Sequence, residues 1–265
     1  MPEKRRCLDV LLTDRGLANS RTLARGMIMA GEVYVGGSRA DKPGLQFDAD
    51  AEIEVRSSAP RFASRGGEKL EGALEDFGID VRGLAALDAG SSTGGFTDCL
   101  LQRGAARVYA VDVGRGQLDW RLRGDARVVV LEGKNARYLK PGDLPENPAL
   151  ATLDLSFISL TKVLPAVLPL LAAEAAVLPL VKPQFEAGRE AVERGGVVRD
   201  PMQHEAALHS IVAFLYNSGV DIVAVAPSRL LGPKGNREFF IHAVKRPPRA
   251  ALESLEAEIG RAVEG

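Results

Sequence analysis

The chain has 265 residues, 46% of them apolar and 26% charged, with a formal net charge of −1, which suits one or two globular domains with buried cores. Its two cysteines form no CxxC or Cys/His pattern, so we expect neither a disulfide framework nor a metal site. The opening MPEKRR is not apolar, and Pro165, Pro169, Glu174 and Pro179 interrupt the longest apolar stretch, so we expect a soluble, cytoplasmic protein without a membrane span.

The charge is distributed unevenly along the chain. Residues 1–70 contain 12 Lys+Arg and 10 Asp+Glu, a charge of +2, whereas the remainder carries −3. If the protein binds nucleic-acid phosphates, it therefore does so through a local basic face and not through a global field.

A helix–helix–hairpin unit is predicted for residues 1–59. Residues 7–17 carry an apolar helical face, and Ser20 is placed to N-cap a second helix over 21–30 that stops at Gly31. Two short strands, EVYVGG and AEIEVRS, complete the unit, with a Gly-Gly turn after the first.

A break at Ala59-Pro60 opens a polar, glycine-containing segment that we interpret as an interdomain linker over residues 60–67. A helix is predicted from Glu68, where apolar residues recur every three or four positions. The second domain accordingly spans residues 68–265.

From residue 84 onward, short apolar strands alternate with helices. Strands are predicted at 84–90, 107–114, 127–133, 150–157, 174–183, 220–228 and 237–245, and the clearest helices at 97–104, 160–172 and 202–218. This alternation predicts an α/β fold, a doubly wound and mostly parallel sheet. The short connection between the last two strands predicts a terminal antiparallel hairpin, as in class I methyltransferases.

A glycine-rich loop, LDAGSSTGGFTDCL, joins the first of these strands to its helix. Gly90, Gly94 and Gly95 would let the backbone approach a ligand, and the helix N-terminus offers free N–H groups to a carboxylate. Asp112 ends the next strand, 22 residues after Gly90, where an acid typically binds ribose hydroxyls. The Gly-x-x-x-Gly-Gly spacing differs from the dinucleotide fingerprint.

Two alternatives stay open for this loop: a turn without a ligand, and the nucleophile elbow of an α/β-hydrolase. Gly90-x-Ser92-x-Gly94 satisfies the elbow pattern. An esterase would then take Asp154 and one of the three histidines, His204, His209 or His242. The chain contains no HGGG-type oxyanion segment, and Asp112 would have no role.

Four charged residues are candidates for a catalytic set: Lys69, Asp154, Lys182 and Glu238. Asp154 and Lys182 end apolar strands at the ligand-bearing edge of the predicted sheet, Glu238 lies at the start of the last strand, and Lys69 opens the helix after the linker. A buried charge is costly unless it is paired, so each could belong to a structural salt bridge or to a catalytic site. In this order around the glycine loop they resemble the Lys-Asp-Lys-Glu tetrad of FtsJ-like ribose 2′-O-methyltransferases.

The chain more closely resembles the TlyA family of rRNA methyltransferases, whose members are often named haemolysins. The segments that carry this resemblance are SRGGEKL, LDAGSSTGGFTDCLLQRGA, LDLSFISL, LVKPQFEAGR and GNREFF. SRTLARGMIMAGEVYVGG resembles an RNA-binding module shared with a small-subunit ribosomal protein and several pseudouridine synthases.

The resemblance implies a class I, Rossmann-like methyltransferase domain with a seven-stranded sheet, preceded by a small α+β RNA-binding domain. It implies methyl transfer from S-adenosylmethionine to the ribose 2′-oxygen of cytidine in ribosomal RNA, in isolated RNA or in ribosomal subunits, without a metal. Two other classes of protein are the alternatives. The intact tetrad argues against an RNA-binding module on an inactive scaffold, and the interrupted apolar stretch argues against a membrane-active toxin.

A ribose hydroxyl must lose its proton as it attacks the methyl group, and a lysine can accept or steer that proton. We therefore expect Lys182 nearest the hydroxyl, with Asp154 and Lys69 tuning it and Glu238 bracing the set. The residues expected at the cofactor are Asp88, Gly90, Ser91, Ser92, Thr93, Gly94, Gly95, Asp112, Glu132 and Asn135. Those expected to contact the RNA backbone are Arg5, Arg6, Arg21, Arg25, Arg61 and Arg65.

Overall fold

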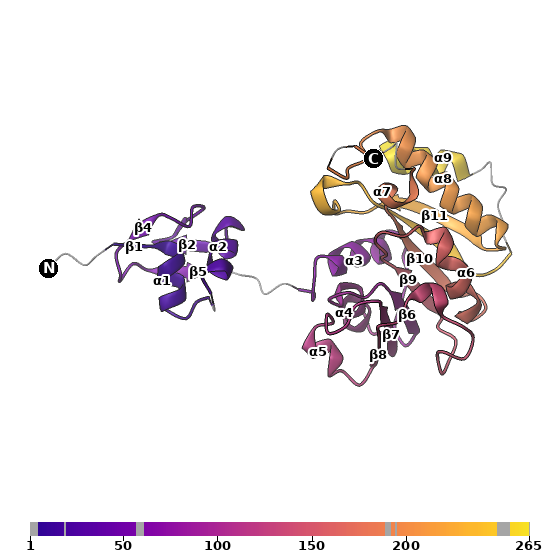
Figure 1. The fold of residues 1–265 in the computed structure, drawn as a ribbon, viewed down its shortest axis with the longest axis horizontal. Helices are drawn as coiled ribbons and strands as arrows, with labels where there is room; N and C mark the ends of the chain where they lie inside the picture. Colours follow the sequence, from indigo (N-terminus) through magenta and orange to yellow (C-terminus); the bar gives the residue numbers. More distant parts are fainter. Residues whose placement is uncertain are drawn as a thin grey trace. The chain divides into compact units, whose positions relative to one another are not determined.

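The computed structural model describes residues 5–18, 20–56, 61–188, 192–193, 195–247 and 255–264 (Figure 1). The chain divides into two compact units, Met1–Arg61 and Phe62–Gly265. The predicted break at Ala59-Pro60 lies outside the described residues.

The described residues of the first unit form two helices and five short strands. They are β1 (Arg6–Cys7), α1 (Leu8–Asp14), α2 (Arg21–Met29), β2 (Val33–Val35), β3 (Ser38–Arg39), β4 (Gln46–Phe47) and β5 (Ile53–Val55). The strands form an antiparallel sheet in the order β3-β2-β5 and a separate antiparallel pair, β1 with β4. The pair was not predicted, because two-residue strands leave no periodicity in the sequence.

Local sequence signals account for the ends of α2 and the hairpin turn. The Ser20 hydroxyl oxygen accepts a hydrogen bond from the Leu23 N–H, and Gly31 follows the helix with a φ of +74°. Gly36 and Gly37 join β2 to β3 with φ values of +53° and +78°, as a tight hairpin turn requires. The predicted helix–helix–hairpin unit is confirmed.

A buried carboxylate holds the two helices of this unit together. Asp9 on α1 is 1% exposed, and its Oδ2 accepts hydrogen bonds from Arg21 and Arg25 on α2, each at 2.9 Å. Burial opposes ionisation of Asp9, but the hydrogen bonds and charges of the two arginines outweigh it, so the pKa of Asp9 lies below its usual value.

The second unit is built on one sheet of seven strands. They are β6 (Ala85–Ala89), β7 (Arg107–Asp112), β8 (Val128–Glu132), β9 (Leu150–Leu153), β10 (Ala176–Val181), β11 (Asp221–Pro227) and β12 (Phe239–Val244). Their order is β11-β12-β10-β9-β6-β7-β8. β12 pairs antiparallel with both β10 and β11, and the other neighbours are parallel. All seven predicted strands, the mostly parallel sheet and the terminal antiparallel hairpin are confirmed.

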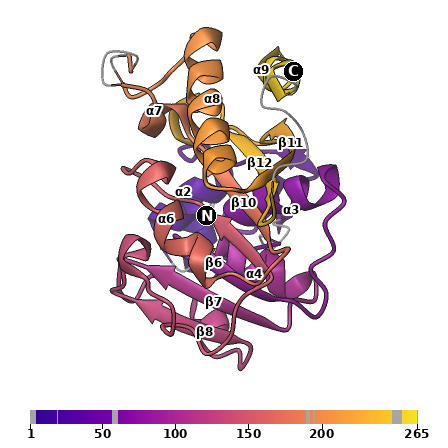
Figure 2. The ribbon, with the colours of Figure 1, turned by 90° about the vertical axis from the view of Figure 1, so that its right-hand side faces the viewer.

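Helices cover both faces of this sheet (Figure 2). One face carries α3 (Gly66–Asp76), α4 (Gly95–Gln102) and α5 (Trp120–Arg123), which pack on the buried side chains of Ala86, Val108 and Leu180. The other carries α6 (Leu164–Val167), α8 (Pro201–Asn217) and α9 (Glu256–Glu264), which pack on Leu87, Leu153 and Ile241. No helix within the described residues is long and apolar enough to cross a membrane.

Two predicted elements differ in extent. The helix predicted at 160–172 is broken into η2 (Leu160–Lys162), α6 and η3 (Leu168–Leu170), because Pro165 and Pro169 lack the N–H that a continuous helix needs. Helix α3 begins at Gly66, two residues before the predicted start. Phe62, within the predicted linker, is 2% exposed and packs in the core of the second unit.

We expect Asp9→Asn to lower the stability of the first unit by about 1–3 kcal/mol at neutral pH, because Arg21 and Arg25 lose their charged acceptor. Since the pKa of Asp9 is lowered in the fold, its contribution is present above the usual pKa of aspartate and is lost as pH falls through the lowered value. Hydrogen exchange of residues 8–56 in the full chain measures the effect. Equal protection in the variant and the wild type at pH 7 would contradict it.

Candidate functional site

The candidate site lies where the strand order of the sheet reverses. Strands β6 and β9 are neighbours in the sheet but lie far apart along the chain, and the chain leaves their carboxyl ends in opposite directions, which opens a crevice between them. Gly90 follows β6 with a φ of +92°, and a Cβ there would lie 2.3 Å from the Asp154 carbonyl oxygen. Only glycine fits this contact, which brings the loop against the segment that follows β9.

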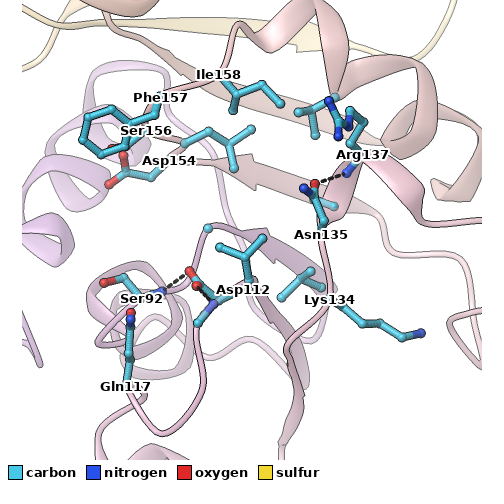
Figure 3. A pocket seen from close by; sticks show the side chains of 17 residues that line it. Ser92, Asp112, Gln117, Lys134, Asn135, Arg137, Asp154, Ser156, Phe157 and Ile158 are labelled. Atoms are coloured by element: carbon cyan, nitrogen blue, oxygen red, sulfur yellow. Dashed lines mark hydrogen bonds between the residues drawn. The ribbon is translucent and has the colours of Figure 1, made fainter.

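A cavity of about 610 Å³ opens beside the glycine loop, and we call it the cofactor cavity (Figure 3). Asp112, at the end of β7, points into it. One oxygen of its carboxylate accepts the Ser92 N–H at 2.9 Å and the other accepts the Gly114 N–H at 2.7 Å. Apolar side chains, among them Val113, Leu155 and Ile158, form other parts of the wall. A carboxylate beside an apolar slot suits a ribose hydroxyl with an attached base.

A second cavity of about 440 Å³ adjoins the first, and we call it the lysine cavity. It shares Gly90, Ser92 and Asp154 with the cofactor cavity. Its lining also includes Lys69, Lys182, Arg65, Thr93 and Leu231. Two ligands could therefore approach each other at the shared residues from opposite sides.

The four residues of the predicted tetrad form two ion pairs. Lys182 Nζ lies 2.5 Å from Asp154 Oδ1 and donates a hydrogen bond to the Ser156 hydroxyl at 3.2 Å. Lys69 Nζ donates to Glu238 Oε2 at 2.6 Å. Lys69 and Lys182 are each 8% exposed and Glu238 is 1% exposed, so these charges are largely desolvated. Pairing is what makes their burial tolerable.

Glu238 is held by the loop that precedes it. A Cβ at Gly232 would lie 2.0 Å from Glu238 Oε1, so the backbone of this glycine lies directly against the carboxylate. Glu238 Oε1 accepts no hydrogen bond from the residues that the structure describes. The carboxylate is therefore directed toward Lys69 through its other oxygen.

The segment before α3 packs on the glycine loop. The Asp98 carboxylate on α4 accepts the Ala63 N–H at 2.8 Å. A Cβ at Gly95 would lie 2.2 Å from Ser64 Oγ and 2.9 Å from the Gly67 nitrogen. Part of the predicted linker thus forms a wall of the lysine cavity, which a linker interpretation did not anticipate.

Most of the predicted cofactor residues line one of the two cavities. They are Gly90, Ser91, Ser92, Thr93, Gly95, Asp112 and Asn135. Asn135 also uses its side-chain oxygen to accept the Arg137 N–H at 3.0 Å (Figure 3). Gly94 lines neither cavity; a Cβ there would lie 2.3 Å from Leu122, so this glycine serves helix packing.

Two predicted cofactor residues, Asp88 and Glu132, form hydrogen bonds to segments next to the cavities and do not line the cavities themselves. Asp88 is fully buried and accepts the Thr97 hydroxyl at 2.6 Å; burial raises the pKa of Asp88 to about 7, although the bond from Thr97 opposes this. Glu132 accepts hydrogen bonds from Arg123 and from the Gly116 and Leu118 N–H groups, which lower its pKa to about 2. Neither lines the cofactor cavity or the lysine cavity.

Several lining residues were not predicted. Val113, Gln117, Lys134, Arg137 and Phe157 belong to loops that follow β7, β8 and β9. The signal available was their position just after a strand, since such loops meet at one sheet edge. Phe157 is 91% exposed with a φ of +64°, which no sequence pattern indicates.

The predicted RNA-contacting arginines of the first unit lie on its surface in ion pairs. Arg5 pairs with Asp48, Arg6 with Asp14, and Arg21 and Arg25 share Asp9. Their side chains stay more than half exposed. The two arginines of the predicted linker, Arg61 and Arg65, are also exposed, and Arg65 lines the lysine cavity.

The esterase alternative lacks its triad. His204 Nε2 is bonded to the Val198 carbonyl oxygen at 2.8 Å, and His242 packs against Phe77. His209 lies exposed on α8. Within the described residues, no histidine is bonded to Ser92, so the serine–histidine pair of an esterase is not formed.

Comparisons with known proteins agree with this geometry. The FtsJ-like methyltransferase family matches residues 62–245, and the S4 domain family matches residues 8–53. The chain is 46% identical to the 16S/23S rRNA (cytidine-2′-O)-methyltransferase TlyA of Mycobacterium tuberculosis over 262 residues, 98% of each chain. It is 40% identical to Hemolysin A of Brachyspira hyodysenteriae over 89% of this chain and 99% of that protein.

Among solved structures, one from Streptococcus thermophilus that carries the name hemolysin is similar over nearly the whole chain. The TM-score is 0.76 and the identity 41%, with 98% of this chain and 96% of that chain covered. The similarity therefore includes both units and not the sheet domain alone.

We expect Gly95→Ala to weaken binding of S-adenosylmethionine at least about tenfold, because the new methyl group would meet Ser64 Oγ and the Gly67 nitrogen and shift the glycine loop, whose Gly90 and Ser92 line the cofactor cavity. Isothermal titration calorimetry measures the affinity. Gly188→Ala is the matched control, since a Cβ there would meet nothing within 4 Å. Equal affinities for the two variants would show that this contact is dispensable.

Proposed function

The chain belongs to the TlyA family of FtsJ-like methyltransferases, and we propose that it transfers the methyl group of S-adenosylmethionine to a ribose 2′-hydroxyl of cytidine in ribosomal RNA. The observation that carries this proposal is the meeting of two cavities at Asp154, with Lys182 2.5 Å from its carboxylate. A ribose hydroxyl needs a proton acceptor at the point where it meets the methyl donor.

The cofactor cavity suits the donor in size and chemistry. Asp112 offers a carboxylate for ribose hydroxyls, and Asn135 lies at the same cavity, where an amide can bond a base. When bound, S-adenosylmethionine supplies an activated methyl group on a sulfonium. The protein's task is then mainly to orient the attacking oxygen, which contributes up to roughly 7–11 kcal/mol in favourable cases.

The lysine cavity suits the acceptor. We propose that Lys182, as the neutral amine, takes the proton of the 2′-hydroxyl while the oxygen attacks the methyl group, and that Asp154 stabilises the ammonium that results. Lys69 adds a second positive charge at this cavity, and Glu238 holds it in place at 2.6 Å. We propose that Arg65, an exposed residue that lines the same cavity, contacts a phosphate of the bound strand.

The S4 domain supports RNA as the substrate class. We propose that Arg5, Arg6, Arg21 and Arg25 of this unit, together with Arg61 and Arg65, contact the phosphate backbone. The base identity and the cytidine preference are proposed from the full-length similarity to the Mycobacterium tuberculosis TlyA.

The direct test incubates ribosomal subunits from a strain lacking the gene with the protein and labelled S-adenosylmethionine, followed by mapping of the methylated nucleotide. We expect a 2′-O-methylated cytidine.

Lys182→Ala should abolish transfer and leave the affinity for S-adenosylmethionine within about threefold of the wild type, because the lysine acts on the hydroxyl. Lys162→Ala, an exposed lysine on η2, is the control. Undiminished turnover in Lys182→Ala would refute the assignment of this residue.

Contacts between these arginines and the RNA phosphates predict that the affinity for RNA falls steeply as the salt concentration rises. If four to six of the arginines bind phosphates, affinity for RNA should fall by about 10²–10³ between 50 and 200 mM salt, through release of counterions. Filter binding of a ribosomal RNA fragment over this range measures the slope, and Arg21→Ala should reduce it by about one. A flat dependence would count against the proposed footprint.

A further inference from the structure

A half-buried carboxylate, Glu186, joins the two segments that carry the Lys182–Asp154 ion pair. Helix α7 (Pro183–Glu186) begins directly after Lys182 and ends at Glu186. Glu186 Oε2 accepts the Ser159 hydroxyl at 2.6 Å, and Oε1 accepts the Leu160 N–H at 2.9 Å. Both oxygens therefore bond the start of η2, five and six residues beyond Asp154.

The two groups that donate to Glu186, the Ser159 hydroxyl and the Leu160 N–H, are uncharged. No lysine, arginine or histidine among the described residues pairs with Glu186, and burial raises its pKa, although the bonds from Ser159 and Leu160 oppose this. A half-buried carboxylate bonded only to a hydroxyl and an amide is not a surface ion pair. Its two bonds fix one loop against another.

The Ser159 hydroxyl, which donates to Glu186, is itself held in place by hydrogen bonds. Ser159 N-caps η2, and its oxygen lies 3.2 Å from the Thr161 nitrogen and 2.8 Å from the Thr161 hydroxyl. A serine hydroxyl has one proton, so the proton donated to Glu186 leaves that oxygen to accept from Thr161. The carboxylate thus completes an ordered turn and does not merely touch it.

These contacts close a ring that contains the ion pair. The ring runs from Asp154 along the chain to Ser159, across to Glu186, back along α7 to Lys182, and across to Asp154 at 2.5 Å. Two further contacts cross it: Lys182 Nζ to the Ser156 hydroxyl at 3.2 Å, and the Phe157 and Phe185 rings with centroids 5.1 Å apart.

We propose that Glu186 is a positioning residue for methyl transfer: through Ser159 and Leu160 it fixes the separation and orientation of Lys182 and Asp154. This rests on the proposed function of that pair. Glu186 lines neither cavity, so it does not touch the donor or the hydroxyl and acts through the two loops. A displacement of about 1 Å in such a site can cost 10²-fold in rate.

The test compares Glu186→Ala, Glu186→Gln and Ser159→Ala in the full chain, with ribosomal subunits as substrate. Glu186→Ala should lower kcat at least about tenfold, with the dissociation constant for S-adenosylmethionine within about twofold of the wild type. Glu186→Gln should recover most of kcat, because an amide can accept the Leu160 N–H and donate to Ser159. Glu256→Ala, an exposed glutamate on α9, is the control.

A double-mutant cycle separates positioning from general stability. Since Ser159 and Glu186 act through one bond, adding Ser159→Ala to Glu186→Ala should cost less in kcat than Ser159→Ala costs alone. Unchanged kcat in Glu186→Ala, or a loss of donor affinity and thermal stability that parallels the loss of kcat and is not rescued by Glu186→Gln, would overturn the proposal. If the wild type methylates a position other than a ribose oxygen, the proposed function fails, whereas the ratios of kcat between the variants and the wild type still test the positioning role of Glu186.

Discussion

The close approach of Gly90 to the carbonyl oxygen of Asp154 is the contact on which the site depends. A Cβ at this glycine would lie 2.3 Å from that oxygen, so no other residue lets the two loops meet. Because of this contact, the cofactor cavity and the lysine cavity share Gly90, Ser92 and Asp154. The parallel pairing of β6 with β9 brings the loops to the same sheet edge, and the reversal of strand order leaves room between them.

The chemistry then follows from charges held in pairs at that edge. An ion pair removed from water is a weak source of stability, since desolvation offsets the attraction between the charges. Because Lys69, Lys182 and Asp154 all line the lysine cavity, we explain the two pairs by a role in the reaction and not by a contribution to stability. Asp154 and Lys182 directly follow the neighbouring parallel strands β9 and β10. Lys69 lies on α3, and Glu238 directly precedes the antiparallel strand β12. The pairs therefore join parts of the fold that the chain separates widely.

Supporting residues determine how firmly these pairs are held. Asp88 accepts a hydrogen bond from Thr97 on α4, and Glu132 accepts one from Gly116 in the loop after β7. Gly232 lies against the carboxylate of Glu238, and Glu186 connects α7 to η2. None of the four lines the cofactor or lysine cavity, yet each fixes a loop that does. Rigid support of this kind is what lets a few side chains orient two reactants without large rearrangement.

The sequence by itself determined the seven strands, the terminal hairpin, the helix–helix–hairpin unit and the glycine loop, because apolar periodicity, caps and turn glycines are local signals. It also indicated Asp154 and Lys182, since charged residues at the ends of apolar strands are uncommon, and the resemblance to the FtsJ-like tetrad added Lys69 and Glu238. Only the tertiary structure decided which lysine pairs with which acid, because those partners are up to 169 residues apart.

Tertiary structure likewise decided the roles of residues that looked equivalent in the sequence. Asp112 and Glu132 both end strands, but only Asp112 lines the cofactor cavity, while Glu132 is turned toward Arg123. The segment 62–67 reads as a polar linker, yet Phe62 is buried and Ser64 abuts Gly95. Glu186 lies in LVKPQFEAGR, one of the segments of the family resemblance, but nothing in that segment indicates its bonds to Ser159 and Leu160. In each case the deciding contact is with a residue distant in the chain, and local sequence carries no record of such a partner.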